Sequence, residues 1–257
     1  MLDLETSRIS DIGGRQRNED ACGGWQSGAT GCWVLSDGAG GHGSGDMASR
    51  LVVSTVLQTF GHGPEVSGTR ALALLQAANA AVMQEKTSGA SHNDMHATAC
   101  ILLLDLAARH AIFGHVGDSR IYHFRQSSLL SRTRDHSLVQ QMLDAGYGDD
   151  RLLRSHPRRN LLTSAIGAAG VIEFSVSSRP VEVLPGDTFL LCSDGWWGLL
   201  EESAMQALLQ RQPAPACWLE AMAGAIRHGA PAGHDNYSAI CVSTRDDRTV
   251  LIDSVSA

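Results

Sequence analysis

The sequence predicts an α+β protein in which groups of β-strands alternate with groups of helices. Short apolar runs bounded by glycine or aspartate predict the strands, and longer segments with apolar residues at helical spacing predict the helices. The 257 residues, of which 43% are hydrophobic, suit one domain or at most two, with a sizeable core. Because the order of elements is not a strict βαβ alternation, the fold is not expected to be doubly wound.

The expected strands are residues 32–36, 98–104, 111–116, 120–124, 171–176, 181–184, 188–193 and 237–243. Residues 111–116 and 120–124 flank Gly117-Asp118-Ser119, a turn signal that predicts a hairpin.

The expected helices begin at polar caps and end near glycine. The first runs from Ser44 or Asp46 to about Phe60, with an apolar face of Met47, Leu51, Val52 and Val56. The second is capped by Thr69 and runs to about Glu85, with an apolar face of Leu72, Leu75, Ala78 and Val82. Three more are expected at about residues 137–145, 202–210 and 216–228.

Residues 146–170 differ from the rest of the chain. They are rich in charge, with Arg151, Arg154, Arg158 and Arg159 among them. We expect an irregular flap over the surface of a single domain spanning residues 1–257. Such segments often carry substrate contacts, although a plain solvated loop fits the composition equally well.

Composition excludes several classes of protein. A formal net charge of −7 argues against general nucleic-acid binding. The six cysteines form no C-x-x-C pair, which argues against a zinc ribbon. No signal peptide and no apolar stretch of membrane-spanning length is visible, so a cytoplasmic protein is the expectation.

Acidic residues next to glycine or asparagine mark several expected strand ends. Asp37-Gly38 and Asp194-Gly195 follow apolar runs, Asp235-Asn236 precedes one, and Glu19-Asp20 is a fourth acidic pair. The first three are placed where the chain is expected to turn sharply. One Asp-Gly pair would be an ordinary turn. Together these carboxylates predict an oxygen-ligand site for magnesium or manganese.

Other sites fit less well. Gly38–Gly43 matches the dinucleotide-binding glycine pattern, but the acidic Asp37 would repel a pyrophosphate, and no strand ending in an acid follows at the required distance. The only lysine, Lys86, is not in a phosphate-binding loop. No cysteine has an arginine six positions later, as cysteine phosphatases require. His92 and His96 lack the intervening glutamate of a zinc motif and are expected to lie in a loop.

Among the catalytic classes considered, metal-assisted hydrolysis is the one that the sequence does not exclude. Two divalent ions can activate a water molecule and hold a phosphoryl group, and an arginine commonly binds the phosphate oxygens. Arg15, four residues before Glu19, is the candidate for that role.

The chain resembles the metal-dependent serine/threonine protein phosphatases of type 2C, the PPM family, in their bacterial form. The matching runs extend over nearly the whole chain; they are residues 14–21, 37–42, 117–120, 133–137, 162–167, 185–187, 193–195 and 235–236. The resemblance implies a four-layer α-β-β-α sandwich with two central antiparallel sheets. It also implies that residues 146–170 form the variable flap beside the active site.

The resemblance implies two core Mn²⁺ or Mg²⁺ ions and a third, looser one. Asp37 would bridge the core ions, and Gly38 would offer its carbonyl. Asp194 and Asp235 would complete the first ion.

Asp20, with Glu19 beside it, would contribute to the second ion, mainly through water. Asp118 would hold the third ion together with Asp194, and Arg15 would bind the substrate phosphate.

One position departs from the family. Bacterial members usually have methionine where this chain has Ala39, and many eukaryotic members have a histidine proposed as the general acid. Alanine cannot protonate the leaving serine or threonine oxygen, so a metal-bound water or another group must do so. We do not assign that role to His42.

The sequence therefore predicts hydrolysis of phosphoserine and phosphothreonine on proteins by direct attack of a metal-activated water. The expected partners are phosphoproteins and a bacterial serine/threonine kinase whose action it opposes, with secretion-system regulation among the contexts of such pairs. The alternatives are a regulatory phosphatase acting on a sigma-factor antagonist and a binding module without activity. Dinucleotide binding is the weakest alternative.

Overall fold

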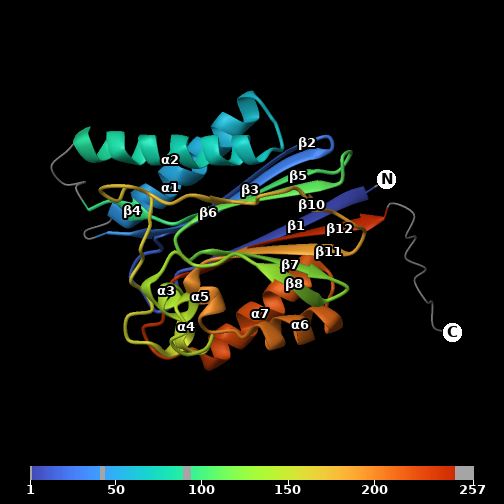
Figure 1. Ribbon diagram of the computed structural model, residues 1–257. Coiled ribbons are helices and arrows are strands. Elements are labelled where there is room, and N and C mark those ends of the chain that lie inside the picture. The colour runs from blue at the N-terminus through green and yellow to red at the C-terminus, as the bar shows by residue number, and fades with distance from the viewer. Residues whose placement is uncertain (1, 41–43, 89–93, 247–257) are drawn as a thin grey trace.

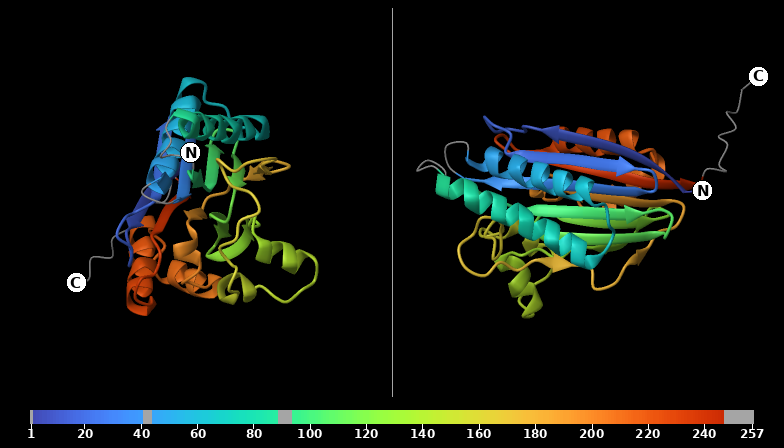
Figure 2. Two further views of the ribbon diagram at one scale, coloured as in Figure 1. Left: turned by 90° about the vertical axis from the view of Figure 1, so that its left-hand side faces the viewer. Right: turned by 90° about the horizontal axis from the view of Figure 1, so that it is seen from above.

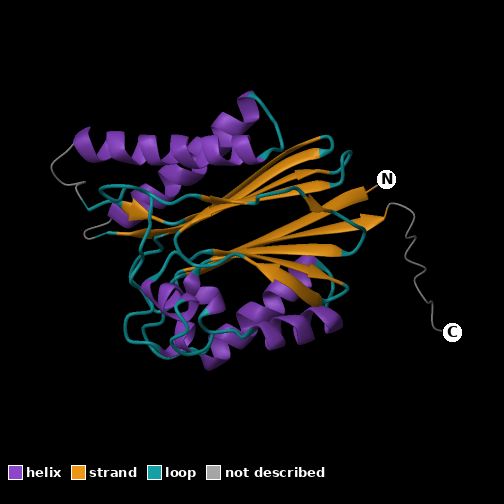
Figure 3. Ribbon diagram, viewed as in Figure 1, coloured by secondary structure: helices purple, strands orange, loops and turns teal. Residues whose placement is uncertain are grey.

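The computed structural model describes residues 2–40, 44–88 and 94–246 and shows two β-sheets packed face to face between layers of helices (Figure 1). Coloured by secondary structure, the strands form the middle of the molecule and the helices lie on both outer sides (Figure 3). The predicted four-layer α-β-β-α sandwich is confirmed.

One sheet has five strands in the order β1-β12-β11-β7-β8, all antiparallel. These strands are β1 (Leu2–Asp11), β7 (Arg120–Arg125), β8 (Ser128–Arg132), β11 (Asp187–Cys192) and β12 (Tyr237–Asp246).

The other sheet follows the order β10-β6-β5-β3-β2, with β9 paired to β6 and β4 paired to β3. Its strands are β2 (Asp20–Ser27), β3 (Thr30–Ala39), β4 (His96–Ala97), β5 (Ala99–Asp105), β6 (His110–Val116), β9 (Ser175–Val176) and β10 (Val181–Glu182).

The long helices cover the outer faces of the sheets. Helices α1 (Ser44–His62) and α2 (Gly68–Ser88) contact β2, β3 and β6, and the view from above shows them across that sheet (Figure 2). Helices α6 (Glu202–Arg211) and α7 (Pro215–Gly229) contact β1, β8 and β12 on the other side. The short helices are α3 (Leu138–Asp144), α4 (Leu152–Ser155) and α5 (Asp194–Trp197).

Three apolar clusters hold these layers together. One lies between α1, α2 and their sheet, one between the other sheet and α5 to α7, and one between the two sheets. A strand in the middle of such a sandwich is buried on both faces, so its sequence is continuously apolar rather than alternating. Residues 32–35 of β3 and 189–192 of β11 show this pattern, and all are buried.

Several sequence-based expectations about elements are wrong. Residues 111–116 and 120–124 do not form a hairpin, because β6 pairs with β5 whereas β7 pairs with β11 and β8. Gly117, with φ of +92°, turns the chain as it crosses from one sheet to the other. Asp37 does not end its strand, since β3 continues to Ala39. In the expected strand 171–176, only Ser175–Val176 pairs, and Val171 is fully exposed.

Helix starts also differ in one case. The second helix begins at Gly68, and the Ser67 hydroxyl, not Thr69, accepts a hydrogen bond from the Arg70 amide at 3.0 Å. Ser137 does cap its helix, since its side chain accepts from the Gln140 amide. Met47, expected on the apolar face of the first helix, is 38% exposed.

Strands β1, β2, β4 and β8 and helices α4 and α5 were not expected from the sequence. Within the described residues, no helix is long and apolar enough to cross a membrane.

Candidate active site

A cavity of about 240 Å³ lies at one end of the sandwich, where loops and strand ends from both sheets meet. Most of the predicted site residues line it: Arg15, Glu19, Asp37, Gly38, Asp118, Asp194 and Asp235. Asp20 lies directly beside it, because Asp20 on β2 is the antiparallel partner of Asp37 on β3. The structure therefore brings together all of the residues that the sequence predicted for the metal and phosphate site.

Asp37 is held by backbone and hydroxyl contacts. Its amide donates to Thr98 Oγ1 at 2.9 Å, and its carbonyl accepts from the Thr98 amide at 2.8 Å. The next residue has no room for a side chain, since a Cβ on Gly38 would collide with the carbonyl of Gly45 at the start of α1. Close packing of β3 against α1 thus fixes the strand that carries Asp37.

Asp20 is buried beneath the cavity. Its Oδ2 accepts a hydrogen bond from the Ser193 hydroxyl at 2.8 Å, and the same hydroxyl accepts from the Ser238 amide at 3.0 Å. Its Oδ1 is buried and has no hydrogen-bond partner among the described residues. An unpartnered buried carboxylate oxygen is costly and points to a ligand that would satisfy it.

Asp118 and Asp194 reach the cavity from the ends of two adjacent strands, since Arg120 at the start of β7 pairs with Cys192 at the end of β11. Asp118 is buried where the chain crosses between sheets, and its carbonyl accepts from Trp197 Nε1 at 2.9 Å. Asp194 follows β11 directly and opens α5. A Cβ on Gly195 would collide with the carbonyl of Asn236, so close backbone packing joins this turn to the loop carrying Asp235.

Asn236 connects that loop to residues 12–20. Its Oδ1 accepts from the Glu19 amide at 2.8 Å, while its Nδ2 donates to the carbonyls of Ile12 and Arg17. Arg15 lies in the segment so held, and its Nη2 is 2.8 Å from Asp235 Oδ2. Arg15 therefore reaches the carboxylates while its side chain remains about half exposed at 54%.

The carboxylates repel one another. Burial and then the charges of Asp20, Asp194, Asp118 and Asp235 raise the pKa of Asp37 well above its usual value. Burial is also the largest cause raising the pKa of Asp20 to about 7 and that of Asp194 to about 6.

Glu19 and Asp118 show the same trend. Burial raises the pKa of both, followed by the charge of Asp46 for Glu19 and of Asp194 for Asp118. A cluster with this much unpaired negative potential is suited to bind cations.

The donor set fits hard divalent ions. Carboxylates, a backbone carbonyl and water are the ligands that Mg²⁺ and Mn²⁺ prefer. Among the described residues, no three carboxylate, imidazole or thiol groups form a ligand cluster by themselves. Water molecules and the Gly38 carbonyl would have to complete the coordination, as is usual for Mg²⁺, which keeps several waters.

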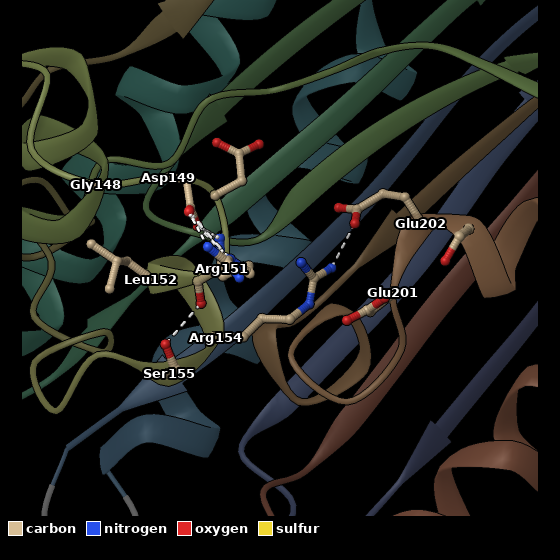
Figure 4. A pocket seen from close by; sticks show the side chains of 10 residues that line it. Gly148, Asp149, Arg151, Leu152, Arg154, Ser155, Glu201 and Glu202 are labelled. Atoms are coloured by element: carbon tan, nitrogen blue, oxygen red, sulfur yellow. Dashed lines mark hydrogen bonds and ion pairs between the residues drawn. The ribbon is translucent and has the colours of Figure 1, made fainter.

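The flap arginines are partly neutralised. Arg151 lies 2.6 Å from Asp149, and Arg154 lies 2.8 Å from Glu202, as the close view of the flap cavity shows (Figure 4). That cavity is larger, about 850 Å³, but its charged side chains largely pair with one another. Arg159 is close enough to Asp194 for its charge to lower the pKa of that carboxyl, against the larger raising effects of burial and Asp235.

The titratable lining residue that the sequence reasoning missed is His96. His96 lies in β4, not in a loop, and lines the cavity beside the carboxylates. The sequence offered one signal for His96, a histidine next to an apolar run, and this pattern is too common to identify a site residue. Its partner across the sheet is not readable from the sequence. His92 and His42 lie outside the described residues.

Comparison with known proteins finds a matching family model and similar sequences. The family model described as "Protein phosphatase 2C" matches residues 10–221. The "Serine/threonine phosphatase stp" of Listeria monocytogenes serotype 4b is 31% identical over 186 residues, which cover 69% of this chain and 71% of the relative.

Solved structures are similar over nearly the whole chain. The catalytic domain of PstP, solved in complex with two manganese ions, superposes with a TM-score of 0.80 at 27% identity and covers 96% of this chain and 100% of that one. PppA, described as a key regulatory component of T6SS in Pseudomonas aeruginosa, has a TM-score of 0.74 at 30% identity and covers 94% and 97%.

Proposed function

This chain belongs to the protein phosphatase 2C family, and we propose that it hydrolyses phosphoserine and phosphothreonine on proteins at the carboxylate-lined cavity. The family is one of metal-dependent serine/threonine phosphatases, and Mn²⁺ or Mg²⁺ is the cofactor. The observation that carries the assignment of the site is the cluster of buried, mutually repelling carboxylates around Asp37.

The proposed ligands divide between the ions. Asp37 would serve both core ions with the Gly38 carbonyl beside it, and Asp194 and Asp235 would complete the set that holds the first. When bound, the ions lower the pKa of a water molecule and offset the charge of the phosphate. The antiparallel pairing of Asp20 with Asp37, and the unpartnered Asp20 Oδ1, support a place for Asp20 at the second ion.

Two more carboxylates have proposed roles. Glu19 supports the second ion, and its position is held by the hydrogen bond from its amide to Asn236. Asp118, with Asp194, would hold a third, looser ion. Its pKa is raised by burial and then by the charge of Asp194, which supports their proximity.

Arg15 is the proposed phosphate ligand. Its guanidinium is anchored on one side by Asp235 and exposed on the other, so it has donors left for two phosphate oxygens. Water attacks phosphorus directly, and the departing group is the serine or threonine oxygen. Residues 1–257 are proposed to form one phosphatase domain whose flap, residues 146–170, borders the cavity.

The proposed partners are phosphoproteins and a bacterial serine/threonine kinase that phosphorylates them, in the cytoplasm. The likeness to PppA, whose description names it a regulatory component of T6SS, supports secretion-system regulation as one setting. An acidic-peptide preference of the flap would depend on Arg158 and Arg159, because Arg151 and Arg154 already have carboxylate partners.

The test compares wild type with Asp235→Asn on p-nitrophenyl phosphate and a phosphothreonine peptide, with manganese and with chelator. We expect manganese-dependent turnover that the substitution abolishes. The matched control is Asp105→Asn at the opposite end of β5, which should keep wild-type turnover. Folded wild-type protein without turnover in any divalent metal would contradict the proposal and favour a binding module.

A further inference from the structure

Hydrolysis of a phosphoserine or phosphothreonine leaves an alkoxide that must take up a proton. Ala39 cannot supply it. Among the described residues that line the cavity, His96 has the only imidazole, and the other titratable side chains are carboxylates or Arg15. This inference rests on the proposed function and asks which side chain protonates the leaving oxygen.

The position of His96 follows from strand pairing. β4 pairs antiparallel with the end of β3, so that Gly38 is opposite Ala97 and Ala39 is opposite His96. Directly opposite residues in an antiparallel pair project from the same face, with Cβ atoms about 4.5–5.5 Å apart. The imidazole therefore stands next to the side-chain position of Ala39, two residues after Asp37.

A cation supports the ring. Lys86 Nζ lies 3.4 Å from His96 Nε2 and donates to the Gly167 carbonyl at 2.7 Å, which fixes the ammonium at this edge of the cavity. The Asp94 carboxylate lies 3.7 Å from His96 Nδ1. Burial, followed by the charge of Lys86, lowers the pKa of His96, against the raising effects of the Asp94 carboxylate and of a hydrogen bond to the Asp94 backbone.

Other polar groups nearby are already engaged. Thr98 Oγ1 contacts the Ser119 hydroxyl at 2.7 Å and accepts from the Asp37 amide. The Asn236 side chain is used at both ends by the segment of residues 12–19. Arg15 keeps its proton under all ordinary conditions.

We propose that His96 is a further catalytic residue that protonates the leaving oxygen, with Lys86 restoring the proton to the ring. As the bond between phosphorus and the leaving oxygen breaks, its electron pair remains on that oxygen, which takes a proton from the imidazole. The attacking water forms the new bond to phosphorus and releases a proton to solvent. Lys86 passes a proton to the ring and is reprotonated from solvent, so charge and atoms balance.

The test uses leaving groups of different basicity. A p-nitrophenolate departs without a proton, whereas a threonine alkoxide does not. For His96→Ala in manganese, kcat/KM on a phosphothreonine peptide should fall about a hundredfold or more. The fold-loss of kcat/KM on p-nitrophenyl phosphate should be about ten times smaller. Lys86→Met should show the same substrate-dependent loss in smaller degree, and Lys86→Arg, which keeps a cation, should recover part of it.

Controls separate this role from a structural one. His62→Ala, at the exposed end of α1, should match wild type on both substrates. Thermal melting and calorimetric manganese binding of His96→Ala should also match wild type. An equal loss on both substrates, or a peptide-selective loss in His42→Ala but not in His96→Ala, would overturn the proposal. Wild type inactive on both substrates would instead overturn the proposed function.

Discussion

Arg15 and Asp235, 220 positions apart in the chain, form an ion pair with Nη2 and Oδ2 separated by 2.8 Å. The proposed phosphate ligand and a proposed metal ligand are thus in direct contact. The Arg15 side chain is 54% exposed and that of Asp235 is 36% exposed, so the ion pair contributes little to the free energy of unfolding. Its effect is to hold the two side chains next to each other.

Arg15→Ala should weaken phosphate binding without weakening metal binding. Charge-assisted hydrogen bonds to phosphate are worth about 1.5–3 kcal/mol, so kcat/KM should fall roughly 10- to 100-fold. Manganese affinity, measured by calorimetry, should stay equal or rise because Asp235 loses a competing cation. Arg17→Ala, an exposed neighbour, is the control. Reduced manganese affinity with unchanged kinetics would contradict the assignment.

Asp37→Asn should abolish manganese-dependent turnover and yet stabilise the chelated protein. The substitution replaces a carboxyl whose ionisation is disfavoured by burial and four neighbouring carboxylates with an amide that cannot ionise. We expect the melting temperature in chelator to rise, and the additional rise normally produced by manganese to disappear. A lower melting temperature than wild type in chelator would show that the repulsion argument is incorrect.

Metal-free stability should depend on pH through Asp20. Its folded pKa of about 7 exceeds the usual 3.8, so the folded state holds the proton more tightly than the unfolded chain. The stability contributed by the protonated form is present below about pH 4 and is lost as pH rises through about 7. Burial lowers the pKa of His115 to about 4, so its contribution makes stability rise with pH, opposite to that of Asp20. A variant that lacks only the Asp20 carboxyl separates the two contributions.

Asp20→Asn is such a variant, since asparagine resembles the protonated acid. In urea unfolding with chelator, the variant should gain roughly 1–3 kcal/mol over wild type between about pH 5 and about pH 8. A constant difference between the two proteins over this range would refute the shifted pKa.

Arg125→Ala should reduce stability and leave catalysis intact. Although burial raises the pKa of Asp187, hydrogen bonds from Arg125 and His123 outweigh it and lower the pKa to about 2. Arg125 contacts both carboxylate oxygens, at 2.7 and 2.9 Å. Removing it strands a buried charge, at a cost of about 2–3 kcal/mol once the partial exposure of Arg125 is allowed for.

The reason catalysis should survive is distance along β11. Asp187 begins this strand, whereas Asp194 follows its other end. Denaturant unfolding and manganese-dependent turnover, measured on the same preparation, give the two readouts. Loss of turnover in folded Arg125→Ala protein would show that the two ends of the strand are coupled.

The sequence was most informative for segments whose residues are buried on both faces. The apolar runs of β3 and β11 predicted buried strands, and the carboxylates beside them predicted an oxygen-ligand site; both elements are present and the carboxylates share one cavity. Strands β1 and β2 were missed because they lie at sheet edges, where half of the side chains face solvent and the pattern is weakly apolar.

Residue types, local periodicity and turn chemistry depend on residues that are close together in the chain, so the family, most elements and the acidic residues could be predicted from the sequence. Pairings between distant segments depend on the packing of the whole chain. It is the folded chain that places β6 and β7 in different sheets, Arg15 in contact with Asp235, and His96 opposite Ala39. Each of these three relationships joins segments that are far apart in the sequence. Strand register and sheet order depend on how the whole core is buried, so no local pattern predicts them.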